Sequence, residues 1–423
     1  MVRRRKVKKS VSSFLYLIVV LTIVGVAIYL VIDNRNKTIL KDEMAKNEVL
    51  SHYNEFVKTS KKTPLYEYEN GKYNKVGEIG KEVELSLDKM DITSDTKYFK
   101  VNTFDREYYI TYSDVEKIDK LSVHSDRYKR YIPFNKNIVT NDKVSLYNEN
   151  NELVYTLPIS LDLPIIINSD NFYGVEYNNR LLYIKNDDIK EYKDSQNTDL
   201  KNTEGIAVLN YHFFYNSDDP SDICDQVICL STNNLKKHLD YIKENNIFTP
   251  TLRELEMYID GIIQLPKSVV LTIDDGWRGD IGSNIMAEYK LNGTVFLMSY
   301  HYDTGAYKNE YIEVHSHGHD IHNPGVCPGG QGGAIKCMEK GKLLADLKAS
   351  REKLDNTTYF CYPFYEYNNY SIEVLKEAGF TMAFGGYMEG GRTRAAPGID
   401  KFRIPRYIIY SYTNVNTIAN YIG

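Results

Sequence analysis

The sequence predicts an α/β fold: a distorted (β/α) barrel domain, preceded by two small all-β barrel-like modules and a transmembrane helix. Three observations predict it. The first forty residues contain a long uncharged apolar run, the next part carries short Tyr-rich strand patterns, and from residue 204 apolar runs alternate with helical patterns. The expected boundaries are 1–10 for a cytoplasmic basic tail, 11–32 for the transmembrane helix, 33–62 for a stalk, 63–122 and 123–195 for the two modules, and 204–423 for the barrel.

The bulk composition is that of a folded protein. Charged residues make up 26% of the 423 residues and aromatic residues 13%, so the chain is globular rather than disordered. The net charge is −5, and beyond the N-terminus there is no sustained basic stripe. Nucleic acid is therefore not an expected partner.

The N-terminal segment determines the expected location. A basic cluster formed by Arg3, Arg4, Arg5, Lys6, Lys8 and Lys9 precedes Val11–Ile32, which carries no charge. About 20 apolar residues span a bilayer as a helix, and the basic end of such a helix stays in the cytoplasm. We expect a single-pass membrane anchor with everything after Asp33 outside the cytoplasm. The alternative is a cleaved signal peptide, whose apolar region is usually only about 7–15 residues long and precedes an A-x-A-like site.

The segment after the anchor predicts a stalk and then strands. Residues 37–58 are polar and compatible with a stalk or a short helix. From residue 63 the pattern changes to short strands, and Asn70-Gly71 is a dipeptide typical of hairpin turns.

This β-rich region also repeats. Tyr108-Tyr109-Ile110 followed by Asp114-Val115 recurs 74 residues later as Leu182-Tyr183-Ile184 followed by Asp188-Ile189. Two small β modules are the natural interpretation. They loosely resemble bacterial SH3-like modules, which implies binding to the cell wall; the alternative is a spacer that binds nothing.

The C-terminal half alternates strands and helices. Its periodicity predicts strands at 206–209, 269–273 and 294–298, and helices at 235–245, 252–263, 340–354 and 372–378, the last one ended by Gly379.

The five cysteines fit an oxidising compartment. Cys224 and Cys229 are close in sequence, as are Cys327 and Cys337, so two local disulfides are expected and Cys361 remains over. A zinc knuckle is the alternative, but neither pair has C-x-x-C spacing.

Two adjacent carboxylates end a predicted strand. Asp274 and Asp275 follow the apolar run 269–273 and precede Gly276. Active sites of parallel α/β barrels lie at the carboxyl ends of strands. Successive strand residues point in opposite directions, so both acids can share a site only if the strand end bends, which Gly276 permits. One acid could then bind a metal while the other acts as a base; an ordinary surface turn is the alternative.

Four of the nine histidines fall within eight residues: His315, His317, His319 and His322. Neutral imidazole is the commonest metal ligand in proteins. Two of these rings and one Asp would provide three ligands and leave positions open, as in catalytic rather than structural metal sites.

These segments, together with Phe360-Cys361-Tyr362-Pro363-Phe364, resemble the polysaccharide deacetylases of carbohydrate esterase family 4, the NodB-type domain, over residues 204–423. The family motif T-F-D-D corresponds to Thr272-Ile273-Asp274-Asp275, with Ile in place of Phe. The resemblance implies that Asp274 is the general base and Asp275 a metal ligand.

The resemblance leaves two choices for the histidine ligands. The pattern H-[ST]-x-x-H matches His315 and His319, whereas the strand that leads into the motif, from Glu313, points to His317. Asn210-Tyr211-His212 resembles the poly-N-acetylglucosamine deacetylases of biofilm systems, whose ligands are five residues apart. We therefore prefer His317 and His322, with His315 and His319 as the alternative.

The remaining site residues also follow from the resemblance. The backbone N–H of Phe364 takes the oxyanion-binding position. No histidine follows His322, so His212 is the implied general acid. Arg406 could orient Asp274, contact sugar or form a structural ion pair. The expected substrate-contacting or supporting residues are Tyr211, Trp277, Tyr362, Pro363 and Arg406.

The implied activity is metal-dependent hydrolytic N-deacetylation of poly-N-acetylglucosamine or peptidoglycan, with release of acetate. Zn²⁺ is the first choice of divalent metal, with Co²⁺, Ni²⁺ or Fe²⁺ as alternatives. The implied partners are the polysaccharide, the cell membrane and, through the β modules, the cell wall. The alternatives are a non-catalytic wall-binding or adhesion protein with a decayed barrel, and an O-acetyl carbohydrate esterase.

Overall fold

The structure is a computed structural model, and it describes residues 3–88, 97–101, 106–199 and 201–423. The side chains of residues 3–11, including the predicted basic cluster, lie outside the description. The chain divides into two compact units, which are described separately below. The first comprises Met1–His124, Thr140–Leu161 and Tyr177–Lys190, and the second comprises Ser125–Val139, Asp162–Glu176 and Glu191–Gly423.

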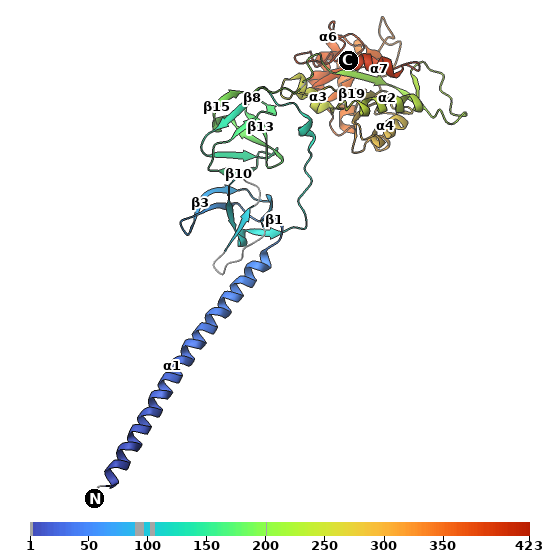
Figure 1. The fold of residues 1–423 in the computed structure, drawn as a ribbon. Coiled ribbons are helices and arrows are strands. Elements are labelled where there is room, and N and C mark those ends of the chain that lie inside the picture. The colour runs from blue at the N-terminus through green and yellow to red at the C-terminus, as the bar shows by residue number, and fades with distance from the viewer. Residues whose placement is uncertain (1–2, 89–96, 102–105, 200) are drawn as a thin grey trace. The chain divides into compact units, whose positions relative to one another are not determined.

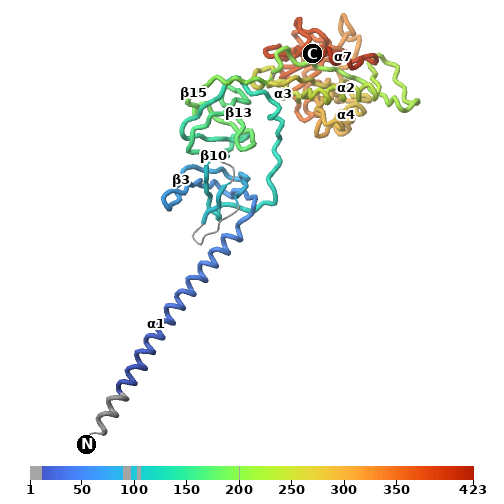
Figure 2. The backbone as a smooth tube through the Cα atoms, in the orientation of Figure 1, coloured from blue at the N-terminus to red at the C-terminus, as the bar shows by residue number. Residues whose placement is uncertain are grey.

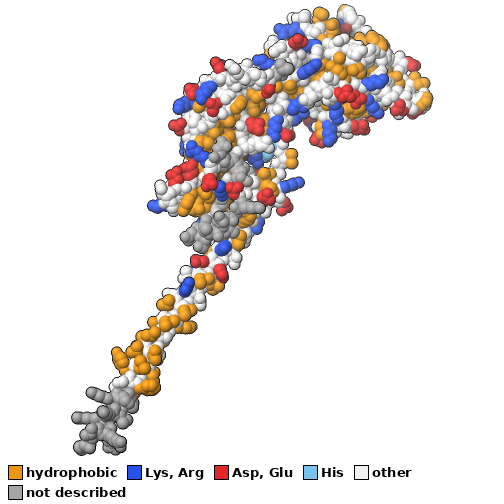
Figure 3. Space-filling model, in the orientation of Figure 1, with side chains coloured by type: hydrophobic (Ala, Val, Ile, Leu, Met, Phe, Trp, Pro, Cys, Tyr) orange, Lys and Arg blue, Asp and Glu red, His pale blue; other side chains and the backbone are white. Residues whose placement is uncertain are grey.

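The first unit begins with one long helix, α1, from Arg3 to His52 (Figure 1). Its part from Ser12 onward is long and apolar enough to cross a membrane, and a signal sequence would have the same properties. Figure 3 shows the apolar side chains exposed along this helix. The helix continues beyond the predicted membrane-spanning part, through the predicted stalk to His52, and no Gly or Pro interrupts this polar stretch.

Antiparallel strands form the rest of the first unit. Seven of them are hydrogen-bonded in the order β14-β9-β10-β3-β2-β6-β5, and three more in the order β4-β1-β7. Leu65, Phe99 and Leu146 are fully buried between them. The strands are β1 (Phe56–Thr59), β2 (Thr63–Glu69), β3 (Lys72–Ile79), β4 (Glu84–Ser86), β5 (Tyr98–Val101), β6 (Tyr108–Thr111), β7 (Val115–Lys117), β9 (Val144–Tyr147), β10 (Leu153–Leu157) and β14 (Arg180–Lys185).

Two local predictions are confirmed in this region. Asn70 and Gly71 join β2 to β3 with φ angles of 52° and 79°, as a tight hairpin turn requires. The repeat is also structural, because β6 and β14 are each followed by a 3₁₀ helix, at Tyr112–Asp114 and Asn186–Asp188, and then by a strand. The division into two SH3-like modules stays a prediction.

A few short strands and a 3₁₀ helix of the second unit precede its main sheet. The strand β11 pairs with β8, and β12 pairs with β13, both antiparallel. The 3₁₀ helix is fastened to the barrel, since Arg127 Nε donates to Glu254 Oε1 at 3.0 Å. These elements are η2 (Arg127–Arg130), β8 (Lys136–Thr140), β11 (Asp162–Pro164), β12 (Ile167–Asn168), β13 (Phe172–Tyr177) and β15 (Ile189–Asp194).

A curled parallel sheet is the centre of the second unit. Its strand order is β23-β22-β21-β20-β19-β16-β24. Nearly every residue of these strands is buried, because helices and the sheet's own interior cover both faces. The strands are β16 (Ala207–Tyr211), β19 (Val269–Ile273), β20 (Gly293–Leu297), β21 (Ile312–Ser316), β22 (Tyr359–Cys361), β23 (Met382–Phe384) and β24 (Tyr407–Ile408).

Six α-helices and short connecting elements accompany this sheet, and α2 packs against both α4 and α7 (Figure 2). The helices are α2 (Thr232–Glu244), α3 (Leu252–Ile259), α4 (Gly279–Glu288), α5 (Lys340–Lys353), α6 (Asn369–Ala378) and α7 (Val415–Ile422). The short elements are β17 (Phe213–Tyr215), β18 (Cys229–Ser231), η4 (Thr304–Ala306), η5 (Ala334–Lys336) and η6 (Pro363–Tyr365).

The segment 401–408 closes the curl of the sheet. Residues 401–406 hydrogen-bond to residues 383–386 beside β23, and β24 then pairs in parallel with β16. The last part of the chain therefore joins the two edges of the sheet. This closure brings Arg406 into the interior of the barrel, where its side chain is fully buried.

The two predicted disulfides are present, Cys224–Cys229 and Cys327–Cys337, and Cys361 is a buried free thiol. The predicted helices and strands of this unit agree with the structure to within a few residues, and the strand 269–273 has the predicted bounds. The largest difference is α3, which ends at Ile259 instead of 263, because Gly261 follows with a φ of 73°.

Candidate active site

A sharp turn follows β19 and carries the two neighbouring carboxylates. Asp275 has a φ of 72° and Gly276 a φ of 105°, and the Gly276 N–H donates to the Asp274 carbonyl at 2.9 Å. A left-handed φ is unfavourable for a residue with a side chain, and such strain collects at functional sites. The bend expected at Gly276 thus starts one residue earlier, and it turns both carboxylates toward one site.

Asp275 lies against two of the clustered histidines. Its Oδ1 is 3.2 Å from His317 Nε2 and 3.3 Å from His322 Nε2, and the three potential ligand atoms lie within 4.8 Å of one another. His317 Nδ1 is 2.9 Å from the carbonyl oxygen of Cys361. A hydrogen bond at Nδ1 orients an imidazole so that the Nε2 lone pair faces a metal. This donor set, one carboxylate and two imidazoles, fits a divalent metal ion with further positions open.

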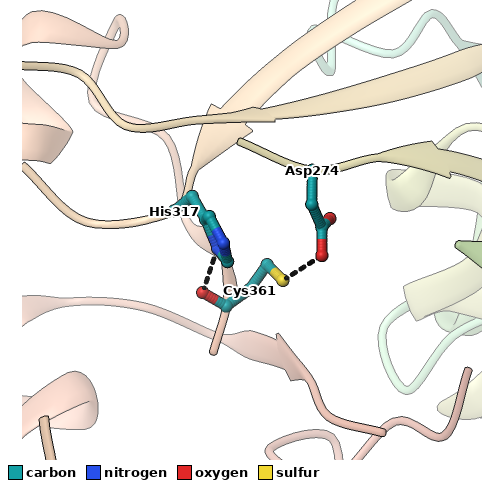
Figure 4. Close-up of side chains that lie close together, drawn as sticks. All are labelled: Asp274, His317 and Cys361. Atoms are coloured by element: carbon teal, nitrogen blue, oxygen red, sulfur yellow. Dashed lines mark hydrogen bonds between the residues drawn. The ribbon is translucent and has the colours of Figure 1, made fainter. Parts of the chain in front are cut away.

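A second group of potential ligands is less suitable for a cation. Asp274, His317 and Cys361 lie together in Figure 4, with Cys361 Sγ 3.3 Å from Asp274 Oδ2. The guanidinium of Arg406 contacts both the carboxylate and the thiol, at 2.8 Å from Asp274 Oδ1 and 3.0 Å from Cys361 Sγ. Its positive charge already neutralises this position and would repel a metal ion.

The other two histidines of the cluster have different partners. His315 Nδ1 is 2.6 Å from Thr357 Oγ1, and His319 Nδ1 is 3.0 Å from Ser299 Oγ. His315 is on the same face of the chain as His317, but two strand residues, or about 6.6 Å, lower along the barrel. The structure therefore brings His317 and His322 to Asp275 and directs the alternative pair elsewhere.

Asp274 is buried and paired with Arg406. The carboxylate is only 2% exposed and the guanidinium is not exposed at all. Burial raises the pKa of Asp274, but Arg406 and His317 outweigh it and hold that pKa below its ordinary value. Arg406 is itself held by the Gly385 carbonyl at 2.9 Å from Nε. Asp274 is thus kept as a carboxylate that can accept a proton.

His212 lies just beyond the carboxyl end of β16, at the same end of the barrel. It is 8% exposed, and its Nε2 is 3.2 Å from the Tyr365 hydroxyl. Burial lowers the pKa of His212 and favours its neutral form, against the opposing charges of Asp274 and Asp275.

Two polar residues of the site, Asn210 and Tyr365, were absent from the predicted set. Asn210 Nδ2 donates to Asp274 Oδ2 at 3.2 Å and to Tyr365 Oη at 2.9 Å. Strand alternation was a usable signal for Asn210, since it lies two residues before His212 and so faces the same side. Nothing in the sequence pattern pointed to Tyr365.

The turn that carries Phe364 borders the metal-binding group. Pro363 is buried at the start of η6, and the Phe364 ring centroid is 4.3 Å from that of His322. Phe364 has a φ of 58°, a conformation that only tight packing maintains in a residue other than Gly.

Two predicted supporting residues, Tyr211 and Tyr362, have hydroxyl groups that bond in the core and not to the metal-binding group. Tyr211 is 1% exposed and its hydroxyl is 3.2 Å from His238 Nδ1 in the core, because alternation along β16 turns it away from His212. The Tyr362 hydroxyl donates to the Phe402 carbonyl at 3.0 Å, also in the core. Trp277 remains accessible, at 41% exposed, with its ring edge against Phe213.

Comparison with known proteins gives one family. Residues 263–383 match the family model described as polysaccharide deacetylase. The matched part includes Asp274, Asp275, His317 and His322, and Arg406 and His212 lie outside it. No curated protein matches the chain.

Several solved structures are similar to part of the chain. A de-N-acetylase from Aggregatibacter actinomycetemcomitans is 19% identical, covers 51% of this chain and 99% of its own, and has a TM-score of 0.43. IcaB from Ammonifex degensii is 20% identical, with 53% and 99% coverage and a TM-score of 0.42. A polysaccharide deacetylase from Bacillus cereus is 14% identical, with 80% and 99% coverage and a TM-score of 0.42.

Proposed function

We propose that this chain, which carries a polysaccharide deacetylase domain and is a hydrolase, removes N-acetyl groups from an N-acetylglucosamine-containing polysaccharide outside the cytoplasm. The observation that carries the proposal is one group of side chains: Asp275 with His317 and His322, next to an Asp274 that Arg406 keeps ionised. Such a pair of carboxylates with different surroundings is suited to two different roles.

A divalent metal, Zn²⁺ in the first place, is the proposed cofactor. Asp275, His317 and His322 would hold it, and the Cys361 carbonyl would keep the His317 ring in position. When bound, such an ion supplies the Lewis acidity that polarises an amide carbonyl and makes water acidic near neutral pH.

The other side chains are assigned as follows. Asp274 accepts a proton from the water that attacks the acetyl carbonyl, and Arg406 holds its carboxylate in place. The Phe364 N–H stabilises the negative charge that develops on the carbonyl oxygen; one such donor is worth about 3–4 kcal/mol. His212 lies at the same mouth of the barrel and serves the leaving amine, a role typically worth about 10²–10⁴ in rate. The products are acetate and a glucosamine unit.

The place of action is proposed from the N-terminal unit. The apolar part of α1 would anchor the chain in the cell membrane, with the disulfide-containing barrel on the outside. Exported poly-N-acetylglucosamine and peptidoglycan are both within reach of such an enzyme. The β strands between the anchor and the barrel would then contact the cell wall.

The test is acetate release from each of these two polymers by wild type and by Asp274→Asn. The substitution preserves the shape of the side chain but removes its basicity, so we expect at least a ~10²-fold fall in kcat. Bound metal should stay at the wild-type level, because Asp275 and both histidines are unchanged. Asp303→Asn, at an exposed carboxylate, is the matched control and should behave like wild type.

Two results would contradict the proposal. One is near-normal acetate release by Asp274→Asn. The other is a wild-type chain that binds metal but releases acetate from neither polymer, as a decayed, polymer-binding barrel would.

A further inference from the structure

The hydroxyl of Tyr365 lies between the two ends of the site. It is 2.9 Å from Asn210 Nδ2 on one side and 3.2 Å from His212 Nε2 on the other. Asn210 Nδ2 also contacts Asp274 Oδ2 at 3.2 Å. A continuous line of hydrogen bonds therefore runs from Asp274 through Asn210 and Tyr365 to His212.

The direction of each hydrogen bond follows from the groups themselves. Asp274 Oδ2 accepts from Cys361 Sγ as well, and the NH₂ end of Asn210 faces this oxygen as a second donor. The amide has two N–H bonds, and the second one donates to Tyr365 Oη. The phenol carries a single hydrogen, and among the described residues His212 Nε2 is the hydrogen-bond partner that can accept it. Burial raises the pKa of Tyr365 well above its ordinary value, so the phenol keeps this hydrogen.

His212 must then carry its own proton on Nδ1. A neutral imidazole has one N–H, and Nε2 is already an acceptor. Among the residues that the structure describes, His212 Nδ1 is buried and has no hydrogen-bond partner. The hydrogen bond between Tyr365 and Nε2 therefore selects the Nδ1–H tautomer of His212.

The backbone around Tyr365 supports a dedicated role. Phe364 and Tyr365 have consecutive φ angles of 58° and 60°, which are unfavourable for residues with side chains. Glu366 braces this turn by accepting from the Gly333 N–H at 2.7 Å and from Lys336 Nζ at 2.9 Å. The Cζ atom of Arg406 lies over the Tyr365 ring, 5.4 Å from its centroid. The strained turn therefore holds the Tyr365 hydroxyl in place, together with the backbone N–H of Phe364.

We infer that Tyr365 is a positioning residue that fixes His212 in the Nδ1–H tautomer and links it through Asn210 to Asp274. Its consequence for catalysis rests on the proposed function, whereas the tautomer itself does not. With Nε2 held as an acceptor, His212 can take up a proton at this nitrogen and deliver it to the leaving amine, as the proposed function requires.

The direct test is ¹⁵N NMR of the full chain in detergent with labelled histidine, in which His212→Gln identifies the His212 signals. Wild type should show the Nδ1–H tautomer. Tyr365→Phe removes only the hydroxyl and should shift His212 toward the Nε2–H tautomer. The matched control is Tyr367→Phe, two residues away, whose hydroxyl bonds to Glu389 and whose ring stacks on Tyr362. It should leave the His212 signals unchanged.

The catalytic consequence is measured on whichever polymer the wild type deacetylates. Tyr365→Phe should lower kcat by about tenfold or more, since general acid–base catalysis depends on the correct protonation state. KM and bound metal should not change. A wild-type Nε2–H tautomer, an unchanged tautomer in Tyr365→Phe, or a changed tautomer with normal kcat would each overturn the inference. Absence of acetate release from the wild type would refute the proposed function instead, and the tautomer would still be decided.

Discussion

At the scale of single residues, the two adjacent carboxylates differ in everything that surrounds them. Asp274 faces a guanidinium, an amide and a thiol, all of which donate to it. Asp275 faces two imidazoles, and although burial raises the pKa of Asp275, His317 and His322 hold it well below its ordinary value. Environments that separate two acids in this way assign them to separate tasks. Here the tasks proposed are proton acceptance and metal binding.

The histidine cluster offers a test of the ligand assignment with its own controls. His317→Gln and His322→Gln each remove a proposed ligand and should weaken Zn²⁺ binding about a hundredfold or more, above the effect of losing an outer partner. His315→Gln and His319→Gln should bind Zn²⁺ like wild type, because these rings contact Thr357 and Ser299. The measurement is a competition titration against a chelator of known affinity.

Loss of metal binding in the His315 and His319 variants, with normal binding in the other two, would establish the alternative ligand pair.

At the scale of elements, alternation along two strands explains which residues reach the site. Asn210 in β16 and His212 just after it face the interior of the barrel, while Tyr211 packs outward against the core. Along β21, His315 and the following His317 share one face at different heights. Strand registers of this kind can be predicted from a sequence once one residue of the strand is assigned to the site.

The helix α2 carries a buried histidine that predicts a pH dependence of stability. His238 is 3.2 Å from the Tyr211 hydroxyl and 3.1 Å from the Thr413 carbonyl, and burial lowers its pKa to about 4. Its pKa in the unfolded chain is the ordinary ~6.5, so the unfolded chain takes up the proton first. The contribution of neutral His238 to the free energy of unfolding is therefore complete above pH 6.5 and is lost as the pH falls toward 4.

For a pKa shift of this size at His238, the free energy of unfolding falls by about 2 kcal/mol between pH 7.5 and pH 5. It should appear as a difference between wild type and His238→Gln in the urea unfolding of the barrel unit, with the variant less dependent on pH. Equal pH dependence in both proteins would show that His238 is not a neutral buried group.

At the scale of the whole molecule, most elements of the barrel could be predicted from periodicity, and both disulfides from cysteine spacing. The family resemblance was enough to predict that Asp275, His317 and His322 lie together. The line through Tyr365 was not, because it depends on a turn with two left-handed residues that are not glycine. Arg406 reaches Asp274 only because the segment 401–408 closes the barrel, a long-range contact that no local pattern encodes.

The proposed anchoring and the proposed catalysis belong to different units. One holds the apolar helix and an antiparallel β region, and the other holds every residue proposed to act on substrate or metal. The activity should therefore depend on the metal-binding group of Asp275, His317 and His322, whatever polymer the anchor and strands bring within reach.

The most direct test of this account is a metal titration of activity. The full chain is stripped of metal with a chelator, Zn²⁺ is added back stepwise, and acetate release is measured on the polymer that the wild type deacetylates faster. The account predicts that acetate release starts near zero, rises in proportion to bound Zn²⁺ and levels off at one ion per chain. Full activity in the stripped chain, or no activity in a chain that has bound one ion, would contradict it.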